Sequence, residues 1–113
     1  MIKVNINNRQ IIITGHAGFA EYGKDIVCAS VSSIVITSIN CALRYDKHSL
    51  KYAEEKDKLV IDILSDDEFV KIIIDNMLAM LSELALTYKK NIKIVKEDSL
   101  WILWNWISNY SHT

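Results

Sequence analysis

The sequence of 113 residues contains no proline and only three glycines, and all three glycines (Gly15, Gly18 and Gly23) fall in one short stretch. Glycine and proline are the residues that most strongly interrupt regular backbone structure. Long, uninterrupted helices and strands are therefore expected elsewhere. The stretch from Gly15 to Cys28 is the main candidate for a functional loop. At this length the chain is expected to fold around a single core.

Cysteine is also scarce, with only Cys28 and Cys41 in the chain. On one helix these residues would lie about 20 Å apart, which is too far for a disulfide bond. A reducing, cytoplasmic setting is therefore expected. The sequence has no C-x-x-C or H-x-x-x-H spacing, so it predicts neither a zinc site nor another cofactor.

An excess of charge of either sign is missing as well. Thirteen basic and fourteen acidic residues leave a net charge of −1, so there is no electrostatic argument for direct binding to nucleic acid or to an acidic membrane. No secretory signal is recognised at the N-terminus.

Residues 26–43 are uncharged and long enough to span a membrane, but they include six serine, threonine and asparagine residues. A buried core helix is the favoured interpretation.

Hydrophobic periodicity predicts strands at residues 2–6 and 10–14, a helix at 26–45, strands at 49–54 and 58–64, a helix from the capping-box sequence 65–68 to about residue 90, and a strand at 91–96. A turn is expected at residues 7–9, and another at 55–57. The order ββαββαβ predicts an α+β fold, in which a mixed five-stranded sheet carries two helices on one face.

The first predicted helix has apolar residues on every side, so it is expected to be largely buried. Residues 33–37 would also suit a strand, but the long uninterrupted apolar run favours the helix. The second helix has a main apolar stripe and a wider second set, which is weak evidence for a partner surface. The stripe contains Phe69, Ile73, Met77, Met80, Leu81, Leu84 and Tyr88, and the second set contains Ile72, Ile74, Leu78 and Leu86.

The loop and the start of the first helix can be interpreted as a catalytic site. In the first turn of a helix capped by Asp25, Cys28 would lie near unpaired backbone N–H groups, which lower a thiol pKa. The glycines would let His16 fold over this helix start. A thiolate beside an imidazole is the nucleophile and base of cysteine acyl transfer. The competing interpretation is a small buried cysteine and a surface histidine with no shared role.

Residues near His16 and Cys28 in the sequence also have both a functional and a structural interpretation. Asp25 is first a helix cap and could also orient His16. Glu21 and Tyr22 either contact a substrate or are solvated. Ser32, one turn after Cys28, either hydrogen-bonds near the sulfur or permits close packing. Elsewhere, Cys41 is expected in the core and His48 in a surface turn.

All three tryptophans lie in the last sixteen residues, at Trp101, Trp104 and Trp106. Two parts are therefore distinguished, residues 1–97 as the folded domain and residues 98–113 as a tryptophan-rich tail. The tail either packs on the domain or is poorly ordered, or else it is a docking segment or a dimer contact.

The pattern Gly15-His16-Ala17, followed by Glu21-Tyr22-Gly23-x-Asp25-Ile26-Val27-Cys28-Ala29-x-Val31-Ser32, closely resembles the signature of the ribosomal-processing cysteine protease family, Prp. The resemblance in the order of elements extends over about residues 1–96. The tryptophan-rich tail has no counterpart in the family's pattern.

The resemblance implies that His16 and Cys28 are the catalytic pair, that Asp25 and Ser32 support them, and that the protein is a homodimer. It implies that the loop, with Gly15, Gly18, Glu21, Tyr22 and Gly23, orders over a bound peptide. The implied substrate is the N-terminal extension of large-subunit ribosomal protein L twenty-seven, cut after a pair of phenylalanines. Two alternatives remain: a dimeric module that binds a ribosomal precursor without cutting it, and thiol redox chemistry, which lacks a nearby resolving cysteine.

Overall fold

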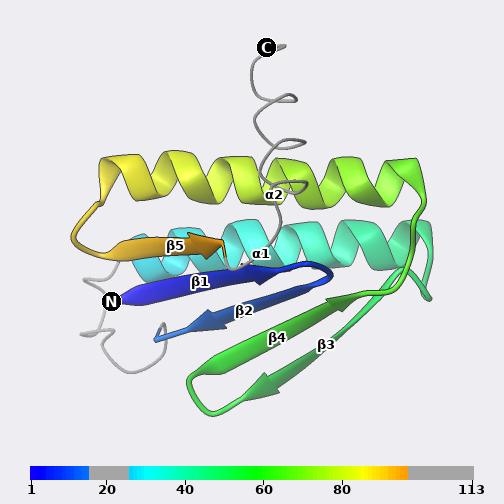
Figure 1. Cartoon of the computed structure of the whole chain (residues 1–113), viewed down its shortest axis with the longest axis horizontal. Helices are drawn as coiled ribbons and strands as arrows, with labels where there is room; N and C mark the ends of the chain where they lie inside the picture. Colours follow the sequence, from blue (N-terminus) through cyan, green and yellow to red (C-terminus); the bar gives the residue numbers. More distant parts are fainter. Residues whose placement is uncertain (16–25, 97–113) are drawn as a thin grey trace.

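A computed structural model describes residues 1–15 and 26–96. The elements follow the order ββαββαβ, as predicted (Figure 1). They are β1 (Ile2–Asn7), β2 (Gln10–Thr14), α1 (Ile26–Tyr45), β3 (Leu50–Glu55), β4 (Lys58–Ile63), α2 (Glu68–Thr87) and β5 (Ile92–Lys96).

The five strands form one sheet in the order β3-β4-β2-β1-β5. Three neighbouring pairs are antiparallel, and β5 alone runs parallel to its neighbour β1, so the predicted mixed sheet is confirmed. Both hairpins turn through a residue with positive φ, Asn8 at 50° and Asp57 at 59°. Asparagine and aspartate tolerate this left-handed conformation better than most residues, which explains why both predicted turns form here.

Both helices cover the same face of the sheet (Figure 1). The core lies between the two layers. Alternate residues of β1, β2 and β4 point into it, including Val4 and Ile61, which are fully buried. This alternation is the period of two that the sequence pattern predicted. The opposite face of the sheet carries the more polar alternate residues, such as Lys3 and Asp62.

Helix α1 buries one stripe instead of its whole surface. Val27, Val31, Val35 and Ile39 repeat at intervals of four and face the core, whereas Ile36 on another side is 54% exposed. The expectation of a largely buried helix is therefore wrong, because α1 lies in an outer layer and has the sheet on one side only. By length and composition alone α1 could also cross a membrane, but its buried stripe packs in the core of this fold.

Helix α2 begins two residues later than a capping box with Ser65 as its N-cap would require. Its N-cap is Asp67, whose carboxylate accepts the Phe69 N–H, while the Ser65 hydroxyl oxygen accepts the Asp67 N–H at 3.0 Å. The Ser65 capping-box prediction is thus wrong in detail. The helix ends at Thr87, before the predicted residue 90, because the chain turns to pair β5 with β1.

The buried face of α2 differs from the predicted stripe. Ile73, Met77 and Leu81 are buried as predicted, but Phe69 and Met80 are 45% and 44% exposed. The buried face is completed by residues outside that stripe. These are Val70, Ile74 and Leu78.

Candidate active site

Gly15 directly follows β2 and has a conformation that favours glycine. Its φ is 83°, and its N–H donates a 3.1 Å hydrogen bond to the Asp57 carbonyl oxygen in the β3–β4 turn. A Cβ atom at this φ would be strained, so glycine is the residue best suited to the position. The start of the predicted loop is thereby tied to the neighbouring hairpin. Sequence reasoning did not find the contribution of Asp57, because it depends on the pairing of β2 with β4.

Cys28 is the third residue of α1, as predicted. It is half-buried and packs against the hydrophobic core, between the buried residues Val27 and Val31 of the same helix. These anchors hold the start of α1 against the sheet. Cys28 therefore has a defined position and still retains access to solvent.

The start of α1 favours negative charge. The first backbone N–H groups of a helix have no acceptor within it, and they carry the positive end of the helix dipole. No acidic side chain lies in the first turn. The N–H groups near Cys28 can therefore stabilise a thiolate or an oxyanion.

Ser32 follows Cys28 by one turn and is also half-buried. Residues four apart lie on the same side of a helix, so the hydroxyl belongs to the side that carries the thiol. Ser30, by contrast, donates its hydroxyl to the Ile26 carbonyl oxygen at 2.7 Å. Of these two serines, Ser32 is the one whose place on α1 suits a contact with Cys28.

Six of the predicted site residues lie outside the described ranges. They are His16, Gly18, Glu21, Tyr22, Gly23 and Asp25. The two ends of this segment are placed, however: β2 ends and α1 begins at the same side of the molecule (Figure 1). The residue before His16 and the helix that carries Cys28 therefore share one edge of the fold.

Two other sequence predictions can be compared with the structure. Cys41 was expected in the core but is exposed, because it lies away from the α1 stripe that includes Ile39 and Ala42. His48 is exposed in the turn before β3, as predicted. Within residues 1–15 and 26–96, no three histidine, cysteine or acidic side chains are grouped to hold a metal ion.

A half-buried thiol in the first turn of a helix is a position that suits a cysteine nucleophile. The family model for the cysteine protease Prp matches residues 1–93, and the chain belongs to this family.

A named relative agrees with this family assignment. The chain is 29% identical over 101 residues to the ribosomal processing cysteine protease Prp of Mycoplasma genitalium, covering 88% of this chain and 98% of the relative.

Two crystal structures of the ribosomal processing protease Prp from S. aureus have the same fold, each with a TM-score of 0.78 and each covering 86% of this chain and 100% of the other. One is a complex with a substrate peptide, at 24% identity. The other holds a covalently linked product peptide, at 25% identity.

Proposed function

We propose that this protein is a cysteine endopeptidase that removes the N-terminal extension of large-subunit ribosomal protein L twenty-seven. The observation that carries the proposal is the position of Cys28, half-buried in the first turn of α1 at the positive end of the helix dipole. The family assignment supports protease chemistry. The S. aureus structure with a covalently linked product peptide supports a covalent route in that relative.

The proposed reaction starts with transfer of the Cys28 proton to His16. The thiolate attacks the scissile carbonyl carbon, and the resulting oxyanion is held by backbone N–H groups at the start of α1. Collapse breaks the C–N bond, and the departing amine takes its proton from His16. Water then hydrolyses the Cys28 thioester, releases the acyl fragment and restores the thiol.

The remaining predicted residues are given supporting roles in this proposal. Asp25 is proposed to cap α1 and could also orient His16, and Ser32 lies one turn after the thiol on the same side of the helix. The loop that contains Gly15, Gly18, Glu21, Tyr22 and Gly23 is proposed to close over the bound peptide. Gly15 supplies its fixed starting point through the hydrogen bond to Asp57.

We further propose a homodimer in the cytoplasm, with no direct contact to nucleic acid or membrane. The even balance of acidic and basic residues supports the last two points. The alternative function is a dimeric module that binds the same ribosomal precursor without cutting it. The two proposals differ in whether Cys28 is required.

The test is mass spectrometry of a peptide spanning the extension, incubated with wild type, Cys28→Ala and Cys41→Ala. Cys41 is the matched control because it is a free cysteine on the same helix but exposed. We expect one cut after the phenylalanine pair with wild type and Cys41→Ala. Loss of the nucleophile should lower the rate by at least about 10³-fold.

Two outcomes would contradict the proposal. Full cleavage by Cys28→Ala would remove Cys28 from the chemistry. Binding of the peptide by all three proteins without any cleavage would favour the non-catalytic module.

A further inference from the structure

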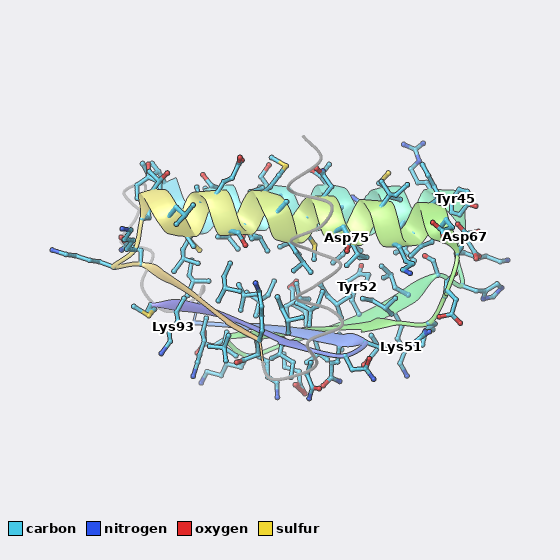
Figure 2. All side chains as sticks on the ribbon, turned by 45° about the horizontal axis from the view of Figure 1, so that its top comes forward. Tyr45, Lys51, Tyr52, Asp67, Asp75 and Lys93 are labelled. Atoms are coloured by element: carbon cyan, nitrogen blue, oxygen red, sulfur yellow. The ribbon has the colours of Figure 1, made fainter. Side chains whose placement is uncertain are left out.

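A cavity of about 330 Å³ lies between α2 and the end of the β1–β2 hairpin. Its floor is apolar and includes the buried residues Ile6, Ile74 and Leu78, while Arg9, Asp66 and Asp75 bring charge to its rim. Figure 2 shows Asp75 on the side of α2 that faces the sheet. An apolar floor with a few polar groups around it is the usual composition of a binding pocket, and this volume is near the lower end of the range for such pockets.

The cavity lies where β5 ends. The last residue of β5, Lys96, pairs with Ile6 of β1, and Ile6 is itself part of the cavity wall. Burial lowers the pKa of the Lys96 ammonium group, which is consistent with a chain that leaves β5 close to the interior. The last described residue of the chain, Lys96, therefore lies next to a residue of the cavity wall.

We infer that this cavity is the docking site of the chain's own tryptophan-rich tail. Trp101 follows Lys96 by five residues, and an extended segment of that length reaches up to about 17 Å. Between Leu100 and Ile107, every residue except Asn105 is apolar. The apolar floor suits these side chains. Asp66 is ion-paired with Arg9 at the rim, and the remaining carboxylate oxygens of Asp66 and Asp75 can accept hydrogen bonds from indole N–H groups, which donate only.

The covalent connection favours the chain's own tail over a second copy. A short tether holds a segment near its site at an effective concentration in the millimolar range. The exposed apolar side chains of α2, Ile72 and Leu86, could also attract the tail. They do not line the cavity, however, and the chain leaves β5 next to Ile6, which does.

The cavity and the candidate active site lie at opposite ends of β1. The cavity is at the β1–β2 turn, which contains Asn8 and Arg9. The end of β2 and the start of α1 lie at the other end of β1 (Figure 1). A tail docked in this cavity would extend the hydrophobic core without covering Cys28. Variants of the cavity should therefore release the tail without abolishing peptide cleavage.

Tryptophan fluorescence of the full-length protein tests this inference, because all three tryptophans lie in the tail. Quenching by acrylamide is measured for the folded protein and for the same protein unfolded in urea. We expect the folded protein to be quenched severalfold less and to emit at shorter wavelength. This difference should not depend on protein concentration.

Two variants alter the cavity from different sides. Ile63→Phe fills it from β4, and Asp75→Lys reverses a charge on α2; each should raise quenching towards the unfolded level. Ile72→Lys, on the exposed side of α2, is the matched control and should behave as wild type. Loss of the helical circular dichroism signal identifies a variant that fails to fold. If one cavity variant fails in this way, quenching in the other cavity variant tests the inference.

Three results would overturn the inference. Equal quenching in the folded and unfolded wild type would show that the tail is not docked. Loss of protection in Ile72→Lys but not in the cavity variants would place the tail on the outer side of α2. Protection that disappears on dilution would assign it to a second copy of the chain.

Discussion

Cys28 and Cys41 show how position on one helix separates two chemically identical residues. Both belong to α1, yet Cys28 packs against the core and Cys41 is exposed. Thirteen residues at 3.6 per turn place them on different sides of the helix. The sequence therefore predicted their separation correctly. It did not predict that Cys41 is exposed, because nothing in it showed that only one side of α1 is covered.

Gly15 leads to a prediction at the scale of one residue. Because its φ is 83°, Gly15→Ala should lower the free energy of unfolding by about 1–3 kcal/mol through backbone strain. Urea unfolding followed by circular dichroism measures this change.

Asn8→Gly is the matched control for the Gly15 substitution, since Asn8 also has a positive φ and glycine relieves strain there. Its stability should stay close to that of wild type. A Gly15→Ala protein as stable as wild type would show that this position does not require the left-handed conformation that glycine favours.

At the scale of the element, the start of α2 depends on one carboxylate. Asp67 accepts hydrogen bonds from the Phe69 N–H at 2.7 Å and from the Tyr45 hydroxyl at 2.9 Å. The Phe69 N–H and then the Tyr45 hydroxyl lower the pKa of Asp67 below its ordinary 3.8. The same bond to Asp67 raises the pKa of Tyr45. One side chain thus caps α2 and links it to the end of α1.

This bond predicts a pH dependence of stability. The pKa of Asp67 is lower in the folded protein than its ordinary 3.8. The stability that its ionised carboxylate contributes is therefore fully present above the ordinary pKa, and it is lost as the pH falls through the folded pKa. Asp67→Asn should therefore be less stable than wild type at neutral pH, and the difference should shrink in acid. Thermal unfolding of both proteins, measured from neutral pH down to strongly acidic pH, tests the prediction.

Tyr45→Phe is a graded control for the cap, because it keeps the ring contact with Phe69 and removes only one bond to Asp67. Its loss of stability should be smaller than that of Asp67→Asn. A stability difference between wild type and Asp67→Asn that stays constant down to strongly acidic pH would contradict the assigned role.

At the scale of the whole molecule, the order of elements could be predicted because the pattern within each element is local. The alternation in β1 and the turn residues Asn8 and Asp57 identified their hairpins without any knowledge of distant contacts. The bond from Tyr45 to Asp67, the exposure of Met80 and the bond from Gly15 to Asp57 depend on how elements meet. No local pattern in the sequence specifies these contacts.

The candidate site, too, was only partly predictable from the sequence. The sequence predicted that Cys28 would lie in the first turn of a helix, and this is confirmed. The pairing of Cys28 with His16 stays a prediction, since His16 lies outside the described residues. The cavity beside β5 was not predicted, because it forms between α2 and a hairpin far from it in the sequence.

Trapping the covalent intermediate during turnover tests most directly whether Cys28 is the nucleophile. The extension peptide is mixed with enzyme, the reaction is stopped in acid, and the intact and digested protein are weighed by mass spectrometry. We predict an adduct with the mass of the N-terminal peptide fragment, joined as a thioester to Cys28, present in wild type and Cys41→Ala and absent from Cys28→Ala. Cleavage that proceeds with no adduct on Cys28, or with one on Cys41, would contradict the account.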